Sequence, residues 1–425
     1  MRLVLTLASM WVGCGDPVPS PDAGPGDAGD APDAPDPFAS CPALVVDVPH
    51  PFPLDDSDGA QCALDAAFRD LPTAAVVCSG EDSHGVAESA AVHGIVFEYL
   101  MRAHGARTVL IESGDAATVP LDDYIATGDE SRLAAYFEPF ARTAAGTNEA
   151  AALIRHLREL SLTLGDGDRV HIRGIDVAVQ PTSTFDRLAA YFAVTDPMVE
   201  ASMRAACPRT LGPGTTASGL SNGAAYLDGV IEGWDGVREG YIASTDAGST
   251  DLAYADLLDL RDGYRFLVYY AMGDFSTGDA MHREPGLERN LLRAAEGGET
   301  VMVMAHNAHC AHGTRIGSAP SLGTRVSSVL TSRYVVIGQS YGHGVQREAD
   351  RAGVFGEVPV GTSGTWAASL AAASELPQFI MLPSQPGYAG DAEYYGEYGD
   401  RLIPTRDFDA IVFLSEATAS TTYMR

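Results

Sequence analysis

The chain has 425 residues, enough for two domains, and its 46% hydrophobic and 20% charged residues are typical of a globular protein. Its net charge of −30 at pH 7 argues against nucleic acid or another polyanion as a partner, because the field of the protein would repel it. An acidic surface of this kind fits a protein that stays soluble outside the cytoplasm.

The first residues are typical of an export signal. Arg2 precedes a largely apolar run from Leu3 to Val12, which is shorter than the roughly 20 residues of a membrane-spanning helix. Small residues flank Cys14, as in a bacterial lipoprotein signal, where the cysteine is lipidated and becomes the mature N-terminus. We therefore predict a signal peptide over residues 1–13 and a lipid anchor on Cys14 in the bacterial cell envelope. Ordinary cleavage, giving a periplasmic or extracellular protein, is the alternative.

Residues 14–40 are predicted to be a disordered tether. Between Asp16 and Pro37 the chain is mostly Pro, Ala, Gly and Asp, and it contains no aromatic residue. Such a segment cannot bury enough apolar surface to offset the entropy lost on ordering. The folded body is predicted over residues 41–425. In an exported, oxidising compartment, Cys41 and Cys62 are the favoured disulfide pair.

Predicted strands and helices alternate along the body. The strands are expected at residues 74–79, 107–112, 169–175, 300–305, 334–338, 379–382 and 408–414, and the helices at 86–104, 131–143, 150–162 and 249–271. This alternation predicts an α/β fold with a mainly parallel central sheet covered by helices. Residues 192–280 show helical patterns without a strong strand, so we expect a helical insertion there.

Carboxylate and imidazole side chains follow four of the predicted strands. They are Glu81 and His84, then Glu112, then Asp176, and finally His306 and His309. In open α/β sheets, ligands bind beyond the carboxyl ends of the strands. If these four strands are neighbours, their polar side chains meet in one site.

The motifs that carry these residues resemble, in the same order, those of the erythromycin esterase family. Residues 80–85 read Gly-Glu-Asp-Ser-His-Gly, which matches the family's G-E-x-x-H-G loop between a strand and a helix. The later motifs of the family match Ile111-Glu112, the turn at residues 174–176 and the His-Asn-Ala-His segment at 306–309. The family also has a helix before the His-Asn-x-His segment, and Arg283 fits its pattern. The resemblance spans about residues 71–413.

The resemblance implies an erythromycin esterase-like α/β fold and a hydrolase that acts on a small-molecule ester or lactone. Characterised members of the family hydrolyse the lactone ester of macrolide antibiotics. Its essential residues map onto Glu81, His84, Glu112, His306 and His309, with His84 as the base that activates water. We assign His93, Asp176 and Asn307 to substrate binding. The family usually has Arg or Lys where this chain has His93, so we expect a substrate range different from that of macrolide esterases.

The residue types themselves support this chemistry. His84 precedes a predicted helix, whose positive end disfavours the imidazolium and keeps a neutral base available near pH 7. The alternative is a histidine that only caps the helix or stabilises the loop. One of His306 and His309 is expected to polarise a carbonyl or stabilise an oxyanion; alternatively, one is functional and the other structural. The chain has no G-x-S-x-G motif, which disfavours a covalent serine route.

The leading hypothesis is an envelope-anchored hydrolase that cleaves an ester or lactone by direct attack of water activated by His84, without a cofactor. Two rival hypotheses remain open. The two glutamates and the histidines could ligate a divalent metal ion, which would give a metal-dependent hydrolase or a metal-binding protein. The third hypothesis is a non-catalytic envelope binding protein that kept the fold.

Overall fold

The computed structural model describes residues 36–42, 50–52, 54, 57–138, 146–165, 167–178, 181–209, 215–313, 315–316, 319–349, 355–360, 377–381, 394–395 and 401–424. The predicted signal peptide, Cys14 and most of the predicted tether lie outside the described residues. Residues 36–40 are described, and the Phe38 side chain is buried with its ring 5.5 Å from that of Tyr99. The folded body therefore starts upstream of Cys41, because this aromatic side chain packs into the core.

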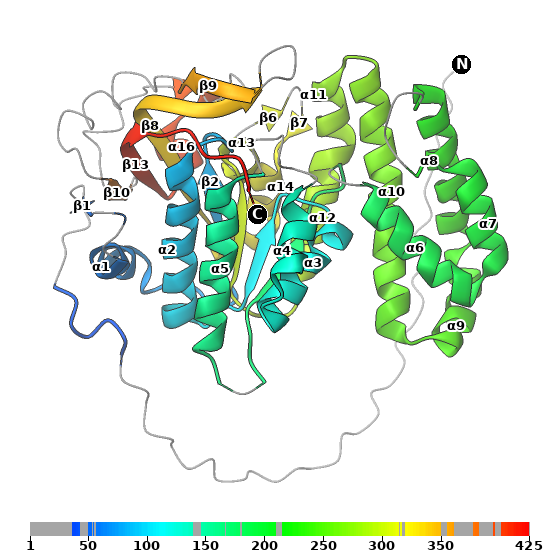
Figure 1. Ribbon diagram of the computed structural model, residues 1–425, viewed down its shortest axis with the longest axis horizontal. Helices are drawn as coiled ribbons and strands as arrows, with labels where there is room; N and C mark the ends of the chain where they lie inside the picture. The colour runs from blue at the N-terminus through cyan, green and yellow to red at the C-terminus, as the bar shows by residue number, and fades with distance from the viewer. Residues whose placement is uncertain are drawn as a thin grey trace, which may run out of the picture.

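A mainly parallel sheet forms the centre of the molecule (Figure 1), so the α/β prediction is confirmed. Its strand order is β1-β10-β13-β8-β2-β5-β3-β4, with β9 paired to β8. The parallel strands are β2 (Val76–Glu81), β3 (Thr108–Ile111), β4 (His171–Gly174), β5 (Val301–His306), β8 (Tyr334–Ala349) and β13 (Ala410–Ala417). The strands β1 (His50–Pro51), β10 (Gln378–Met381) and β9 (Phe355–Pro359) add antiparallel pairings.

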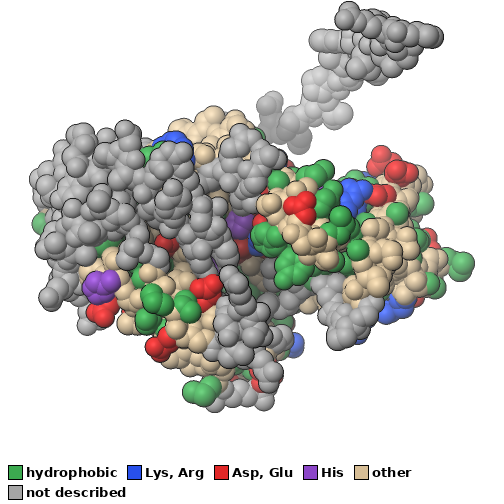
Figure 2. Space-filling model, turned by 90° about the horizontal axis from the view of Figure 1, so that it is seen from above, with side chains coloured by type: hydrophobic (Ala, Val, Ile, Leu, Met, Phe, Trp, Pro, Cys, Tyr) green, Lys and Arg blue, Asp and Glu red, His purple; other side chains and the backbone are tan. Residues whose placement is uncertain are grey.

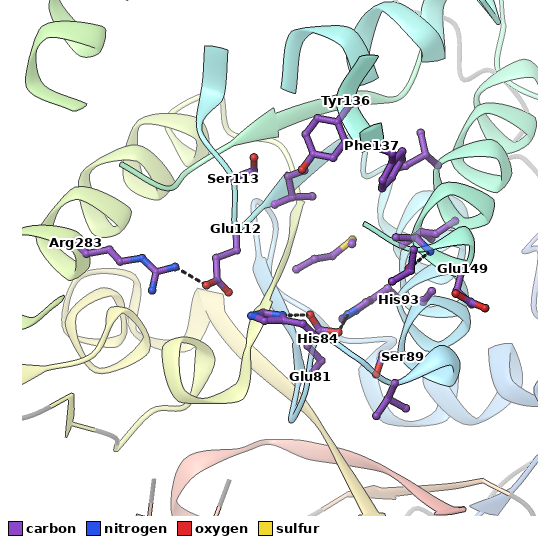
Figure 3. A pocket seen from close by; sticks show the side chains of 18 residues that line it. Glu81, His84, Ser89, His93, Glu112, Ser113, Tyr136, Phe137, Glu149 and Arg283 are labelled. Carbon is purple, nitrogen blue, oxygen red and sulfur yellow. Dashed lines mark hydrogen bonds and ion pairs between the residues drawn. The ribbon is translucent and has the colours of Figure 1, made fainter. Parts of the chain in front are cut away.

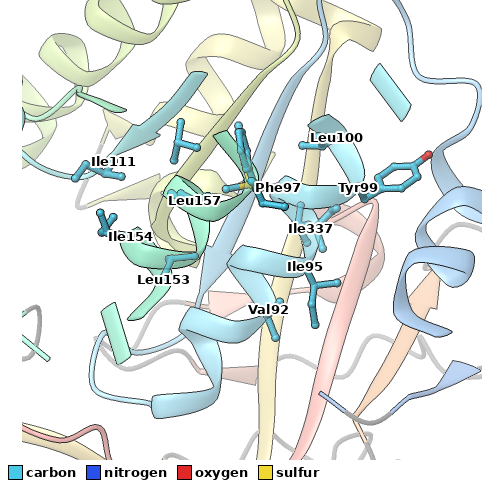
Figure 4. Packing of buried hydrophobic residues seen from close by; sticks show 14 of the residues in the cluster. Val92, Ile95, Phe97, Tyr99, Leu100, Ile111, Leu153, Ile154, Leu157 and Ile337 are labelled. Atoms are coloured by element: carbon cyan, nitrogen blue, oxygen red, sulfur yellow. The ribbon is translucent and has the colours of Figure 1, made fainter. Parts of the chain in front are cut away.

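Helices cover both faces of the sheet. Successive residues of a strand point to opposite faces, so the apolar strand residues form one core on each face. Val77 and Met302 face a core formed with α1 (Ser57–Phe68), α2 (Ala87–His104) and α5 (Asn148–Leu162). Val76 and Val303 face a second core formed with α12 (Glu284–Ala295) and α14 (Leu322–Leu330). Figure 4 shows the first of these cores, where α2 and α5 pack over the strands. Two further helices, α3 (Asp115–Thr127) and α4 (Glu130–Phe137), join it.

A helical part lies to one side of the sheet, on the right in Figure 1. It comprises α6 (Pro181–Thr195), α7 (Pro197–Ala206), α8 (Ala217–Glu232), α9 (Trp234–Ser244), α10 (Ala247–Ala271) and α11 (Phe275–Gly278). These helices have their own core around Phe192, Trp234 and Tyr264. No described residue between 181 and 278 belongs to a strand. The helical part starts at Pro181, upstream of the expected residue 192. Seen from above, acidic side chains are scattered over it (Figure 2).

The remaining elements are short. They are α13 (Asn307–Cys310), α16 (Pro404–Asp407), the π-helix η2 (Asp279–Arg283), the 3-10 helix η3 (Thr331–Arg333) and the paired strands β6 (Arg315–Ile316) with β7 (Ala319–Pro320) and β11 (Tyr394–Tyr395) with β12 (Arg401–Leu402). Most predicted elements exist within a few residues of their expected bounds. The strand expected at 334–338 is longer and continues to Ala349, because its second half pairs with β9. Within the described residues, no helix is long and apolar enough to cross a membrane.

Two disulfides cross-link the described part of the chain. The predicted Cys41–Cys62 pair is confirmed. A second disulfide, which the sequence did not predict, joins Cys78 on β2 to Cys310 on α13 across 232 residues. This bond ties β2, which ends at Glu81 shortly before His84, to the short helix that carries His309. Within the described residues, Cys207 is a free, buried thiol.

Candidate active site

The four strands whose ends carry the polar clusters are neighbours in the sheet. Their order is β2-β5-β3-β4, and all are parallel, so their carboxyl ends lie on one edge. The register places Glu81 of β2 directly beside His306 of β5. This topology brings together side chains that are more than 200 positions apart in sequence.

A cavity of about 370 Å³ lies over this edge (Figure 3). Its polar side, at the strand ends, is lined by Glu81, His84, His93, Glu112, Ser113 and Arg283. Its opposite side is formed mainly by apolar side chains of α2, α4 and α5. The ionisable groups at the strand ends therefore lie next to apolar side chains, which limit the access of water.

Glu81 holds His84 at the cavity wall. His84 Nδ1 lies 2.6 Å from Glu81 Oε1, and His93 Nε2 lies 3.7 Å from Glu81 Oε2. Burial alone would raise the pKa of Glu81, but its contacts with His84 and His93 lower that pKa to about 2. Glu81 is thus a carboxylate at neutral pH and accepts the Nδ1 proton of His84. A neutral His84 in this tautomer has its basic lone pair on Nε2.

His306 holds the loop that carries His84. Its Nδ1 accepts a hydrogen bond from the Ala308 N–H (3.2 Å), so its Nε2–H donates to the Asp82 carbonyl oxygen at 2.8 Å. Burial and the neighbouring His84 lower the pKa of His306 to about 3, so the ring is neutral at pH 7. The two histidine rings pack edge to face, 5.6 Å apart. His306 does not line the cavity and instead positions its neighbour.

Glu112 stands at the boundary between the cavity and a buried ionic network. Its Oε1 accepts a hydrogen bond from Arg283 Nη2 at 2.6 Å and lies 3.4 Å from His309 Nε2, while its Oε2 accepts one from the His306 backbone N–H at 2.9 Å. Burial would raise the pKa of Glu112, but His309 and Arg283 hold it well below its usual value. Arg283 also binds Asp176, with Nη2 and Oδ2 2.5 Å apart.

His309 differs from His306 in its charge: its imidazole ring is protonated. Its Nδ1 forms an ion pair with Glu284 Oε1 at 2.5 Å, and Glu284 is fully buried. Burial alone would lower the pKa of His309, but the carboxylates of Glu284 and Glu112 raise it well above the ordinary histidine value. His309 is therefore an imidazolium behind the cavity wall, and it does not line the cavity.

The residues assigned to substrate binding occupy different places. His93 lines the cavity, and its Nδ1 lies 2.8 Å from Ser79 Oγ. Asp176 is buried against Arg283 and does not line the cavity. Asn307 is also buried away from the cavity, and its Nδ2 donates to the Gln339 carbonyl oxygen of β8 at 2.7 Å.

The glycines of the first motif allow this close packing. A Cβ on Gly80 would lie 2.3 Å from Asn307 Oδ1, and a Cβ on Gly85 would lie 2.0 Å from the Arg347 carbonyl oxygen. Only a residue without a side chain fits at either position. The glycines therefore let the end of β2 pack against α13 and the His84 loop pack against β8.

Several site residues were missed by sequence reasoning. Arg283 was recognised only as part of a helix pattern, yet it lies at the centre of the ionic network. Glu284 and Asp279, which flank that network, carry no motif; burial raises the pKa of Asp279 to about 6 despite Arg283 and His309. A charged run inside an otherwise amphipathic helical pattern is the only signal that could have indicated them. No group of three or more described His, Cys, Asp or Glu residues is arranged to hold a metal ion.

Known proteins place the chain in a family. The family model for erythromycin esterase matches residues 101–417, which include Glu112 and His306–His309 but not the Gly80–Gly85 loop. No curated protein matches the chain by sequence.

Three solved structures share the fold. A Bacillus cereus protein is 16% identical with a TM-score of 0.73, over 88% of this chain and 97% of its own. A succinoglycan biosynthesis protein is 17% identical with a TM-score of 0.71, over 88% and 96%. A histidine-to-asparagine mutant of the erythromycin esterase EreC, in its open conformation, is 14% identical with a TM-score of 0.68, over 86% and 95%. Because the family model covers most of its length, this chain belongs to the erythromycin esterase family, a family of ester hydrolases.

Proposed function

We propose that the protein hydrolyses an ester or lactone by direct attack of a water molecule that His84 deprotonates. The observation that carries this proposal is the 2.6 Å contact between His84 and the ionised Glu81 at the wall of the cavity. Glu81 holds the imidazole ring in the productive tautomer and stabilises the imidazolium that forms on proton transfer.

The reaction has two proton transfers. His84 Nε2 takes a proton from water as the oxygen attacks the carbonyl carbon of the ester, which gives a tetrahedral oxyanion. The intermediate then collapses, the bond to the alcohol oxygen breaks, and His84 returns the proton to that oxygen. Arg283 lines the same cavity and supplies positive potential toward the oxyanion. Asp176 and Glu112 hold its guanidinium in place.

The serines near the base do not favour a covalent route. Ser83 is buried, accepts a hydrogen bond from the Gly85 N–H at 3.2 Å and does not line the cavity. Ser89 does line the cavity, but its hydroxyl is bonded to that of Tyr341 at 2.8 Å. Neither hydroxyl is hydrogen-bonded to His84, as a serine nucleophile would be.

Replacing the base tests the mechanism. On a panel of activated esters and lactones, His84→Ala should lower turnover about 10²–10⁴-fold, the typical contribution of a general base, while the fold stays intact by circular dichroism. His171→Ala, at a half-exposed histidine on β4, is the matched control and should leave turnover unchanged. Unchanged activity in His84→Ala would exclude the mechanism. Activity that is lost on chelation and restored by zinc would indicate a metal-dependent hydrolase instead.

We further propose that the enzyme acts in the bacterial cell envelope, anchored by a lipid on Cys14. The disulfides Cys41–Cys62 and Cys78–Cys310 support this location, because such bonds persist in oxidising compartments. Mass spectrometry of protein purified from membranes should find a diacylated cysteine at the N-terminus, and Cys14→Ala should move the protein to the soluble fraction. An unmodified N-terminus downstream of Cys14 would indicate ordinary secretion.

A further inference from the structure

The cavity at the active site has two chemically different sides. Opposite the ionisable groups stand Phe137 of α4 and Leu153 and Ile154 of α5, which are 2%, 5% and 4% exposed. Ile111 and Met304, from the ends of β3 and β5, continue this surface beneath them. Figure 3 shows Phe137 across the cavity from Glu112, and Figure 4 shows Leu153 and Ile154 together on α5. We call this surface the helix-side wall; its apolar side chains favour contact with apolar groups of a substrate.

The charges around the cavity disfavour an anionic substrate. Among the described lining residues, the only arginine is Arg283, and its guanidinium already binds Glu112 and Asp176. Glu149, on the same side as the helix-side wall, is a further carboxylate; it accepts hydrogen bonds from the backbone N–H and hydroxyl of Thr421. A phosphate, sulfate or carboxylate group on the substrate would meet like charges without a partner.

A buried hydroxyl lies where the polar side meets the helix-side wall. Ser113 is 2% exposed and lines the cavity. The Tyr136 hydroxyl lines the same region, and burial raises its pKa to about 12, so it stays protonated at neutral pH. Hydroxyl groups at this place can donate a hydrogen bond to a neutral oxygen atom of a ligand, such as that of an ester group.

A second cavity of about 400 Å³ lies next to the first, between α2 and α5, and the two cavities have Ala90, Glu149 and Leu153 in common as lining residues. Small residues line it, among them Ala87, Ala91, Gly94 and Ala152, and Glu98 and His156 in its lining lie 3.8 Å from each other. Ala87 to Glu98 spans about 16 Å of helix α2 at the usual rise per residue. We call this cavity the α2–α5 groove. It runs alongside α2 and opens to solvent at the exposed Ala91 and Ala152, so it can accept a flexible aliphatic chain.

We propose that the substrate is an ester or lactone of an uncharged aliphatic acid, whose acyl chain lies against the helix-side wall and extends into the α2–α5 groove. The inference rests on the proposed function and names its substrate class. Because the groove and the His84 cavity share lining residues, we assign the acyl chain of the substrate to the groove. The carbonyl carbon then lies at the polar side, next to His84 and Arg283.

A series of p-nitrophenyl esters tests the proposal on the full-length enzyme. From acetate through butyrate to octanoate, kcat/KM should rise by up to about fourfold per methylene group buried. An octanoate-length ester that ends in a carboxylate should be hydrolysed no better than the acetate.

Filling the groove should remove the preference for long chains. Ala91 and Ala152 line the groove but not the catalytic cavity. Ala91→Phe and, independently, Ala152→Phe should lower kcat/KM for octanoate about tenfold or more and leave acetate hydrolysis unchanged. The matched control is Ala126→Phe, at an exposed position on α3, which should alter neither.

Failure of this inference is distinguishable from failure of the proposed function. A flat chain-length profile with hydrolysis that still depends on His84 would overturn the acyl-chain site alone. Equal loss on acetate and octanoate in both groove variants would also overturn it. Absence of any hydrolysis that depends on His84 would overturn the proposed function itself.

Discussion

The two sides of the active site use the same residue types for opposite purposes. On the cavity side, Glu81 contacts His84 and His93, and the His84 side chain is 28% exposed, so its proton can exchange with a ligand. On the buried side, Glu112 contacts His309 and Arg283, and Glu284 closes the network from behind. A Glu–His pair can act as a base where the histidine faces a cavity. The same pair is a fixed charge where carboxylates enclose the histidine.

The buried side also explains how the cavity side keeps its geometry. Glu112 accepts a hydrogen bond from the His306 backbone, and the His306 side chain donates to the Asp82 carbonyl next to the His84 loop. A short chain of contacts therefore runs from the ionic network to the base. The comparison predicts that changes on the buried side act on stability first, and that changes on the cavity side act on turnover or specificity.

The largest expected effect on stability comes from Arg283. Replacing it with Met leaves the carboxylates of Glu112, Asp176 and Asp279 buried without their common cation. Removing one partner from a buried ion pair typically costs about 3–5 kcal/mol, so Arg283→Met should lower the free energy of unfolding in urea by about that much. Arg238→Met breaks the exposed Arg238–Asp251 pair and should cost less than about 1 kcal/mol. Similar losses in the two variants would contradict the picture of a buried, interdependent network.

The next effect concerns the disulfide that joins the two sides. Replacing both Cys78 and Cys310 by Ala should destabilise the protein by about 2–4 kcal/mol. It should also lower turnover at a temperature where the variant is fully folded, because β2 and α13 are no longer linked. The matched control is removal of Cys41–Cys62, which should cost stability but not turnover of the folded enzyme. If both double variants keep full turnover, the buried disulfide has no role in aligning the site.

A smaller effect on stability is expected from the difference in charge between the neutral His306 and the protonated His309. In the folded chain His306 has a pKa of about 3, whereas an unfolded histidine takes up its proton near pH 6.5. Falling pH therefore protonates the unfolded state first, and this residue removes up to about 1.4 kcal/mol of stability per pH unit below pH 6.5. The stability advantage of wild type over His306→Asn should therefore shrink as the pH falls below 6.5, because only wild type loses this contribution.

His309 should show the opposite sign. Because its pKa is raised in the folded chain, its contribution to stability is complete below pH 6.5 and is lost as pH rises through the folded pKa. Glu284→Gln should therefore flatten the alkaline limb of the stability profile, whereas His306→Asn should flatten the acid limb. Identical profiles for the two variants would show that the histidines do not differ in charge.

The smallest effect is expected at His93 on the cavity side. His93→Arg places a permanent charge about where Nε2 now lies, 3.7 Å from Glu81 Oε2. Because the residue lines the cavity, we expect the kcat/KM ratio between anionic and neutral esters to change by about tenfold in favour of the anionic ones. An unchanged ranking of the substrate panel would show that a positive charge at position 93 does not affect specificity.

Much of this architecture could be predicted from the sequence. Buried apolar runs placed the strands that end near Glu81, Glu112, Asp176 and His306, because hydrophobic patterning is a local property. The helix expected over 86–104 ends at Gly105, which adopts a left-handed φ of 67° that favours glycine. These signals depend on a few neighbouring residues, so a sequence contains them in full.

Local patterns could not determine the partners of the site residues. Asp176 and Asn307 were expected to bind substrate, but both lie in the buried framework of the sheet edge. Nothing near Cys78 in the chain indicates Cys310, and a helix pattern does not show that Arg283 will meet carboxylates from two strands.

The sequence by itself determined the elements, the motif loops and the glycines that let them pack, since each depends on short-range sterics and patterning. Only the tertiary structure decided that β2, β5, β3 and β4 are neighbours and that the helix-side wall faces the base. It also decided that His306 is neutral while His309, three residues later, is charged. The physical reason is that burial and charge partners set a pKa, and here the partners come from Asp82, Glu112 and Glu284, which lie far away in the chain.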